Sequence, residues 1–372
     1  MKKTLLLTGL SLGLMACHQD AVKEQPVVMA EKVNSGITLK NMDKNVRAQD
    51  DFYQHVNGKW LREFELPADK SNYGGFTKLA ELSRERVQTI INDVSKTDNA
   101  QGSSEQKIAD IYRSFMDAEA INAKGLTPLK SELAKIDAIN SRADLSEYMG
   151  YADIYGSSPL SMYVYIDQKK SDEHIVYVGQ SGLGLPNRDY YFKDDEKSQN
   201  IRDKYQQHIA NMFTLAGIKQ PEAAMKTVYA IEKDLATGHW TPIQNRDRDK
   251  TYNKMNFAEF TSKVPNVNWG AWLTHTMIEQ PEQLVVTQPS YLDTLNEVIG
   301  NYSVEDWQNY YKWHMLSSYA RYLRADFEAE KFAFYGTVLS GTTEQEPRWK
   351  RGVDLVNGLA GELVGKVYVK SY

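Results

Sequence analysis

The sequence predicts a mainly α-helical fold of many helices with one small β-hairpin. Apolar residues recur at helical spacing in most segments after residue 76, whereas strict alternation of apolar residues occurs in one place. The chain has 372 residues, of which 41% are hydrophobic and 11% aromatic. A chain of this length and composition can bury a large core, which excludes a disordered protein.

The chain begins with the features of an export signal. Two lysines precede the apolar run LLLTGLSLGL, which is too short to span a bilayer as a permanent helix. The sequence LMAC at residues 14–17 resembles the lipobox of bacterial lipoproteins, in which the cysteine carries the lipid. We therefore predict a lipoprotein signal peptide over residues 1–16, cleavage after Ala16 and lipid attachment at Cys17. An ordinary signal peptide with an incidental cysteine is the alternative.

Cys17 is the only cysteine in the sequence, so no internal disulfide can form and an exported protein must rely on its core for stability. His18, and not Asp, comes next, which favours the outer membrane by the usual bacterial sorting pattern. We expect an exported protein that is anchored to the bacterial membrane by its lipid and faces the periplasm. Residues 17–40 mix charges, Pro and small residues without a period, and they predict a flexible tether.

The charge balance excludes one class of partner. Removal of residues 1–16 takes away two lysines and no acid, which leaves 42 basic and 49 acidic residues and a net charge of −7. No basic stripe stands out, so nucleic acid is not expected as a partner. Contact with the membrane is expected through the lipid on Cys17 only.

Helical segments are predicted in order along the chain. The first has apolar residues on one face, namely Phe76, Leu79, Val87, Ile90, Ile91 and Val94. The second covers residues 104–123, where Gly125 is placed to stop it, and Thr127-Pro128 opens a third. The remaining helical patterns lie at 144–154, 197–216, 221–237, 257–263, 290–299, 304–335 and 349–369.

One segment has the alternation of a β-hairpin. Apolar residues alternate with tyrosines over residues 162–166, and the apolar run at 175–178 follows a polar turn. The stretch LGLPNRDYYF (residues 183–192) comes directly after the second strand. Near the C-terminus, Gly358, Gly361 and Gly365 fall in a helical pattern, where we expect small residues to allow the close approach of another element.

The sequence offers no catalytic group. The seven histidines, at positions 18, 55, 174, 208, 239, 275 and 314, are at least 31 residues apart, so no H-E-x-x-H pair exists. No G-x-S-x-G places a serine nucleophile, and adjacent acids such as Asp50-Asp51 are expected by chance among 49 acids. We therefore assign no catalytic residue and no metal ligand to this chain.

Four stretches resemble one family. They are DDFYQHVNGKWL (residues 50–61), NYGGF (72–76), LGLPNRDYYF (183–192) and RWKRGVDLVNGLAGELVGKVYV (348–369). Together they are similar to the N-terminal region of the neprilysin-type zinc metallopeptidases, family M13. Their order and spacing match the family from about Gly36 to the last residue.

The resemblance implies a helical capping domain over residues 41–372 that lacks the thermolysin-like catalytic domain. In this family the cap limits access to the zinc, so that peptides and small unfolded segments are the substrates. The resemblance therefore implies the substrate-gating half of a lipid-anchored zinc metalloendopeptidase, truncated before the zinc site and inactive alone. Zinc is expected in the complete enzyme and not on this chain. Residues at about 50–62 and 349–372 are expected to contact the missing C-terminal catalytic half.

Two departures from the family pattern are informative. In neprilysin, two arginines that bracket the Y-G-x-F stretch receive the C-terminal carboxylate of the substrate. The matching positions here are Asn72 and Ala80, so the resemblance implies that Asn72 and Tyr73 face the substrate without a guanidinium clamp. An endopeptidase with little preference for dipeptide release is expected. Asn57 and Gly352 replace cysteines of vertebrate members, which fits a bacterial protein without disulfides.

A second hypothesis belongs to another class. With 23 tyrosines, the chain could be a non-catalytic periplasmic lipoprotein that binds peptides or another protein through a tyrosine-rich surface. The first hypothesis predicts exposed apolar surface at Phe52 to Trp60 and at Val353 to Val369.

Overall fold

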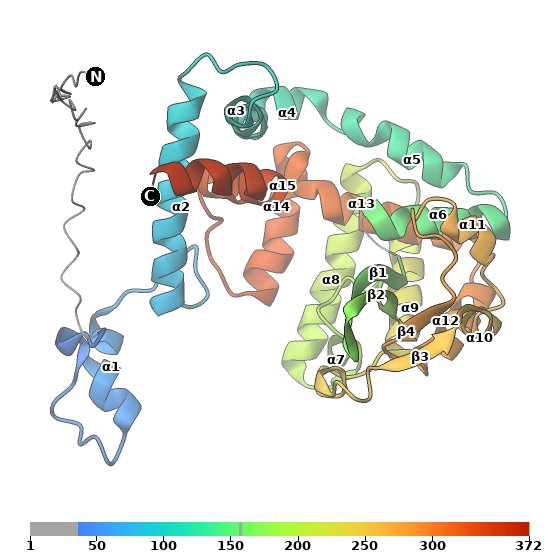
Figure 1. Ribbon diagram of the computed structural model, residues 1–372, viewed down its shortest axis with the longest axis horizontal. Helices are drawn as coiled ribbons and strands as arrows, with labels where there is room; N and C mark the ends of the chain where they lie inside the picture. Colours follow the sequence, from blue (N-terminus) through green and yellow to red (C-terminus); the bar gives the residue numbers. More distant parts are fainter. Residues whose placement is uncertain (1–35, 156–157, 372) are drawn as a thin grey trace, which may run out of the picture. The chain divides into compact units, whose positions relative to one another are not determined.

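The computed structural model describes residues 36–155 and 158–371 (Figure 1). The chain divides into two units, one that ends at Glu65 and one that begins at Leu66. The predicted signal peptide, with Ala16 and Cys17, lies outside the described residues, and so does most of the predicted tether.

The first unit contains a short 3₁₀ helix, η1 (Leu39–Asn41), and the helix α1 (Phe52–Glu63). Asp51 caps α1, because its carboxylate accepts a hydrogen bond from the backbone N–H of Gln54 at 2.9 Å. Phe52 and Tyr53, which the resemblance assigns to a contact surface, are 70% and 60% exposed.

One part of the second unit is a group of three helices that share one apolar cluster, two from its start and one from its end. They are α2 (Gly75–Ser95), α3 (Ser104–Met116) and α15 (Arg348–Ser371). Their cluster consists of Val87, Ile90, Ile91, Val94, Ile108, Ala109, Val353, Val356 and Val364. The valine and isoleucine side chains at helical spacing on these three helices therefore pack against one another and are shielded from solvent.

The helix predicted at 104–123 is two helices. Asp117 leaves the helical conformation (φ −76°, ψ 75°) and caps α4 (Ala118–Lys124), where its carboxylate accepts from the backbone N–H of Ala120 at 3.0 Å. An aspartate inside a periodic pattern can act as an N-cap, so the pattern alone did not reveal the break.

The rest of the unit is a larger helical body with a small sheet on it. Its longer helices are α5 (Lys130–Asp137), α6 (Arg142–Tyr155), α8 (Glu196–Leu215), α9 (Pro221–Gly238), α12 (Tyr291–Asn301) and α13 (Val304–Tyr319). Its shorter helical elements are η2 (Thr127–Leu129), α7 (Asp189–Phe192), η3 (Gln244–Arg246), α10 (Phe257–Lys263), α11 (Trp269–Leu273), η4 (Ala320–Tyr322) and α14 (Ala325–Lys331). The expected mainly α-helical fold is confirmed.

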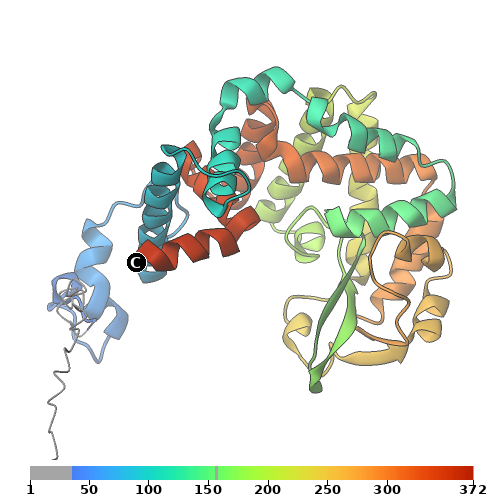
Figure 2. The same cartoon turned by 45° about the horizontal axis from the view of Figure 1, so that its top comes forward.

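The sheet contains the predicted hairpin and two more strands. Strands β1 (Leu160–Asp167) and β2 (Lys170–Gln180) pair antiparallel, and the hairpin projects from the helical body (Figure 2). Strand β4 (Gln283–Val286) lies parallel to β2, and β3 (Asn253–Asn256) pairs with β4 on its other side. The last two strands have four residues each, which is too few for an alternation to be recognised in the sequence.

The helix predicted at 304–335 is interrupted. Helix α13 ends at Tyr319, and Leu323 is extended (ψ −176°) before α14 begins. Residues Phe332–Leu339 then form a π-helix, η5, a rare element that is frequent at functional sites. Apolar spacing predicted helical character here but not the change of helix type.

Two expectations for α15 need correction. A Cβ placed on Gly358, Gly361 or Gly365 would meet no atom of the described residues within 4 Å, so these glycines do not serve the close approach of another element of this structure. The apolar residues are also mostly covered, since Val353, Val356 and Val364 belong to the cluster with α2 and α3. Leu359 and Val369 remain 68% and 80% exposed. Contact of this helix with a catalytic half stays a prediction.

No helix within residues 36–155 and 158–371 combines the length and the apolar character that a membrane span requires.

Candidate substrate-facing site

The two residues predicted to face a substrate lie in the segment that leads into α2. Asn72 is exposed, and its amide donates to Ser71 Oγ at 3.4 Å. Tyr73 is half-buried, and its hydroxyl donates to Glu81 Oε2 at 3.3 Å. Desolvation and the charge of Glu81 raise the pKa of Tyr73, so this phenol is neutral at physiological pH and serves as a hydrogen-bond donor.

The first half of α2 exposes its apolar side chains. Phe76 is 92% and Leu79 63% exposed, whereas Val87 is 4% exposed. The apolar face predicted for this helix is therefore buried at Val87 and the apolar residues after it, and exposed at Phe76 and Leu79. The physical reason is that α3 and α15 pack on the second half, through Val87 and the residues after it. The exposed side chains of Phe76 and Leu79 make this end of α2 a candidate contact surface.

A network of ion pairs surrounds Glu81, the residue that accepts the hydrogen bond from Tyr73. Lys70 Nζ lies 3.5 Å from Asp69 Oδ2 and 3.4 Å from Glu81 Oε1, and it also donates to Glu346. Lys350 Nζ contacts the same two acids, with Glu81 Oε1 at 3.0 Å and Asp69 Oδ2 at 3.5 Å. Glu81 thus holds Tyr73 on one side and two ammonium groups on the other.

The charges in this network stabilise one another. Burial alone would lower the pKa of Lys70, but its hydrogen bond to Glu346 and the charges of Glu346, Asp69 and Glu81 raise it. Burial would raise the pKa of Glu81, but Lys350 and Lys70 lower it. Both groups therefore stay ionised at neutral pH, and the network is a fixed support and not a proton relay.

Arg84 does not replace the missing arginine clamp. Its guanidinium binds Asp354 in a bidentate manner, with Nε–Oδ1 at 2.9 Å and Nη2–Oδ2 at 3.0 Å, and Nη1 lies 3.3 Å from Glu346 Oε1. All three nitrogens are engaged by carboxylates of this chain. The arginine nearest to Ala80 in the sequence is therefore committed to structure.

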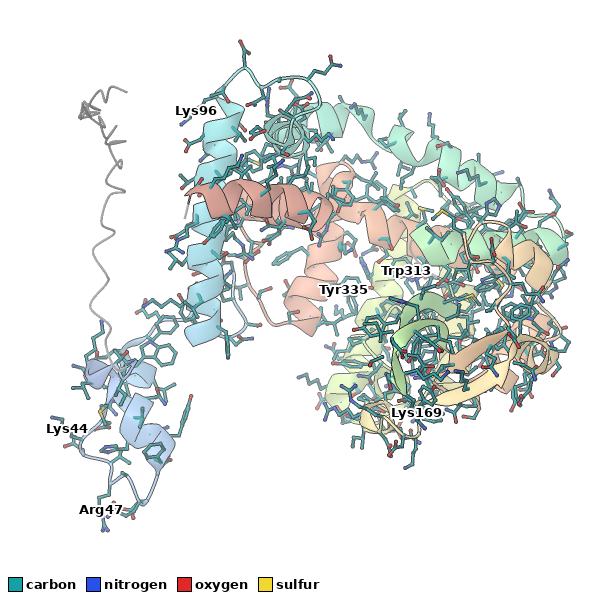
Figure 3. The ribbon with its side chains drawn as sticks, viewed as in Figure 1. Lys44, Arg47, Lys96, Lys169, Trp313 and Tyr335 are labelled. Atoms are coloured by element: carbon teal, nitrogen blue, oxygen red, sulfur yellow. The ribbon has the colours of Figure 1, made fainter. Side chains whose placement is uncertain are left out.

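The acids of the network also line a cavity of about 280 Å³. Asp69, Glu346 and Asp354 are among its lining residues, and other lining residues come from α3, η4, α14, the π-helix and α15. Gly336 is required there, because a Cβ on it would lie 2.4 Å from the ring of Phe332. Tyr335 on the same π-helix is marked in Figure 3. The cavity was not predicted from the sequence.

The stretch LGLPNRDYYF has a structural role. Tyr191 is 2% exposed, and its hydroxyl donates to Glu232 Oε2 at 2.8 Å and accepts from the backbone N–H of Leu185 at 3.2 Å. Glu232 is fully buried and also accepts from the Tyr205 hydroxyl at 2.7 Å and from Trp313 Nε1 at 3.1 Å. Tyr191 thus fixes the decapeptide to a buried carboxylate of α9. The role of the decapeptide is therefore structural.

Glu232 does not stand out among the 49 acids of the sequence. The available signal was its position on the apolar face of α9, between Val228 and Leu235, which are both fully buried. A charged residue at the centre of an apolar helix face must find partners inside the protein.

The described residues offer no metal site. No group of three or more His, Cys, Asp and Glu side chains in residues 36–155 and 158–371 is arranged to hold an ion. The side chains present do not fit a zinc ion, and no step of zinc chemistry can be derived from them. Ala16 and Cys17 cannot be placed, because they lie outside the described residues.

Comparisons with known proteins give one consistent result. The model of "Peptidase family M13" matches residues 48–372. Mouse neprilysin (Mus musculus) is 26% identical over 413 residues, which cover 99% of this chain and 53% of that protein. Endothelin-converting enzyme 1 from Rattus norvegicus is 28% identical over 393 residues, which cover 98% and 50%.

Solved structures agree with these relatives. The crystal structure of the Mycobacterium tuberculosis zinc metalloprotease ZMP1 with an inhibitor has a TM-score of 0.86 and 36% identity, and covers 91% of this chain and 52% of that one. PEPO from Lactobacillus rhamnosis shares the fold, with a TM-score of 0.76 and 20% identity over 88% of this chain and 52% of its own. The chain spans about half the length of the curated relatives it matches.

Proposed function

This chain belongs to peptidase family M13, and from that membership we propose that it forms the N-terminal, substrate-gating half of a zinc metalloendopeptidase. M13 peptidases are zinc metallopeptidases that act on peptides. The gating role, the pairing with a C-terminal catalytic half and the activity of the whole protein are parts of the proposal.

The observation that carries the proposal is the uncovered end of α2. Phe76 and Leu79 are exposed beside Tyr73, while the network of Glu81, Lys70 and Lys350 holds Tyr73 in place. An exposed aromatic and aliphatic pair on a rigid base is what a peptide or a partner domain can bind. Asn72 at the same end of α2 supplies an amide for the backbone of an extended peptide.

In this proposal the C-terminal catalytic half binds the zinc. When bound there it would polarise the scissile carbonyl and activate water. The residues of this chain would contribute the wall that admits peptides, by the shape and polarity of the surface around Tyr73 and Phe76.

We further propose that the protein is a lipoprotein. Lipid on Cys17 would anchor it to the outer membrane with residues 41–372 in the periplasm, in agreement with the lipobox-like sequence and with the absence of any other cysteine. A single acyl chain binds a membrane weakly, so stable anchoring needs the several chains of a lipoprotein modification.

The test is to supply the catalytic half. The gene is read beyond the codon for Tyr372, and a frame that leads to an H-E-x-x-H motif is co-expressed with this chain as a separate polypeptide. Hydrolysis of an unstructured peptide, with and without a chelator, should require both chains. Chelator-sensitive activity of this chain alone would contradict the proposal. A monodisperse chain that binds peptides, in a genome without such a frame, would instead support the non-catalytic binding lipoprotein.

A further inference from the structure

Three cations and five acids line the 280 Å³ cavity, and two of the three cations have no carboxylate partner among the described residues. The cations are Arg321, Lys331 and Arg351. Arg351 pairs with Glu328, but the same carboxylate also lies 3.4 Å from Arg348. In the part of the chain that the structure describes, neither Arg321 nor Lys331 has a carboxylate within the ion-pair distance of 4.0 Å.

Lys331 is the most constrained of these cations. Its Nζ donates to the backbone carbonyl of Ser317 at 2.6 Å and lies 5.8 Å from the centre of the Tyr335 ring. Burial, and then the charge of Arg321, lower the pKa of Lys331 to about 8. The ammonium group is thus mostly charged at neutral pH although it is largely removed from water, and a bound anion would offset that cost.

Three of the acids that line the cavity are paired with cations. Asp354 is held by Arg84, and Asp69 is held by Lys70 and Lys350. Glu346 is held by Lys70 and Arg84. Glu344 is exposed to solvent at the edge. Asp69, Glu346 and Asp354 therefore have cations of their own, whereas Arg321 and Lys331, which line the same cavity, have no carboxylate partner among the described residues.

Part of the remaining lining is apolar or aromatic, and Thr342 and Gln345 add polar groups. Phe115, Phe332, Tyr335 and Leu355 line the cavity. Its volume of about 280 Å³ is at the small end of ligand pockets, so it fits one residue and not a long segment. Lys331 is the last residue of α14, and Phe332 and Tyr335 follow it on the π-helix, so one continuous segment supplies these three lining residues. A π-helix is frequent at functional sites.

We propose that this cavity binds a carboxylate of a peptide, with Arg321 and Lys331 as its ligands and Phe332 and Tyr335 against the adjoining apolar atoms. The carboxylate comes from a free C-terminus or from the side chain of an Asp or Glu residue. The proposal rests on the proposed function in one respect, namely that peptides are the molecules that this domain handles. It assigns anion recognition to Arg321 of η4 and Lys331 of α14, and not to the positions of Asn72 and Ala80.

Three peptides of one neutral core sequence test the proposal on the full-length chain. The first has a free C-terminal carboxylate, the second a C-terminal amide, and the third an amide with one internal Glu. Calorimetry should show at least about tenfold tighter binding of the first or the third than of the second, a difference of about 1.4 kcal/mol. Which of the two binds tighter identifies the source of the carboxylate. Binding should weaken above about pH 8, as Lys331 loses its proton.

The variant Arg321→Gln should remove the preference for the carboxylate and leave the fold intact, because Arg321 is exposed. Lys331→Gln should have the same effect, with its thermal unfolding measured to detect loss of the contact with Ser317. Arg246→Gln, which removes an exposed arginine of η3, is the matched control and should bind like the parent chain. Equal affinity for all three peptides, no binding of any, or a preference that survives Arg321→Gln would overturn the proposal. Hydrolysis by the two co-expressed halves is a separate measurement, so failure of carboxylate binding and failure of the proposed function can be told apart.

Discussion

The hydroxyl of Tyr191 donates a hydrogen bond to the buried carboxylate of Glu232 at 2.8 Å. This contact joins α7, the short helix that follows the β-hairpin, to the middle of α9. Glu232 also accepts from Tyr205 and Trp313, and His314 Nε2 lies 3.0 Å from its Oε1. Three hydrogen-bond donors and a neighbouring imidazole are what allow a carboxylate to remain in a core without solvent.

Tyr191→Phe should destabilise the chain by about 1–3 kcal/mol, because a buried acceptor loses one of its donors and no water can replace it. Urea unfolding followed by tryptophan fluorescence measures the change. Tyr165→Phe removes a hydroxyl from a side chain that is 59% exposed and should alter the free energy of unfolding by less than about 0.5 kcal/mol. Equal stability of the Tyr191→Phe variant and the parent would show that this contact does not support the core.

The pair of Arg84 and Asp354 should show measurable coupling. The variants Arg84→Gln and Asp354→Asn and their double variant form a cycle, for which we expect an interaction of about 0.5–1.5 kcal/mol. The bidentate geometry raises this value, while the 42% exposure of the Asp354 side chain lowers it through solvent screening. Coupling near zero at low salt would mean that the ion pair does not tie α15 to α2. Lys59 and Glu63, an exposed pair on α1, provide a control cycle with a smaller expected value.

The sequence predicted the helices whose apolar residues repeat without interruption, such as α8 and α9, within one or two residues. It did not predict the breaks at Asp117 and Leu323, where a cap or an extended residue overrides the periodicity. It placed the hairpin but not β3 or β4. A strand of four residues is defined by its pairing with a neighbouring strand, which the sequence pattern does not show.

The candidate site was predictable only in part. The resemblance singled out Asn72 and Tyr73, which lie in the segment before α2, and their contact with a substrate stays a prediction. The cavity could not be found in this way, because Asp69 and Arg351 meet only through the tertiary packing of distant segments. The spacing of residues along the sequence does not reveal contacts between distant segments.

The stability of the chain should depend on the ionisation of Asp153. Burial raises the pKa of Asp153 to about 7, although Oδ2 accepts from the backbone N–H of Met162 at 3.0 Å. In the unfolded chain the pKa is near its usual value of about 3.9. A group whose folded pKa is raised contributes stability that is complete below pH 4 and is lost as the pH rises toward 7.

Asp153→Asn should therefore abolish a decline on the order of 2–4 kcal/mol in the free energy of unfolding between pH 4 and pH 7. Denaturant unfolding at closely spaced pH values measures it. Asp172→Asn, on an exposed part of the hairpin, should leave the pH profile of the parent unchanged. A parallel pH profile for Asp153→Asn and the parent would show that this carboxyl does not titrate in the expected range.

Cys17→Ser should prevent lipid attachment. In bacteria supplied with a labelled fatty acid, the parent chain should carry the label and sediment with the outer membrane, whereas the variant should do neither. Mass spectrometry of the mature N-terminus checks that cleavage occurs after Ala16. Membrane association of the Cys17→Ser variant equal to that of the parent would rule out the lipid as the anchor.

The exposed end of α2 should matter for activity and not for folding. Phe76→Ala and Leu79→Ala remove side chains that are 92% and 63% exposed, so the free energy of unfolding should change by less than about 0.5 kcal/mol. In the two-chain enzyme, loss of an apolar contact of this size should lower kcat/KM for peptides by about tenfold, which corresponds to about 1.4 kcal/mol. Ile243→Ala, at a site that is 79% exposed outside α2, controls for the loss of any surface side chain. If Phe76→Ala and Ile243→Ala give the same kcat/KM, then the end of α2 contacts neither the peptide nor the catalytic half.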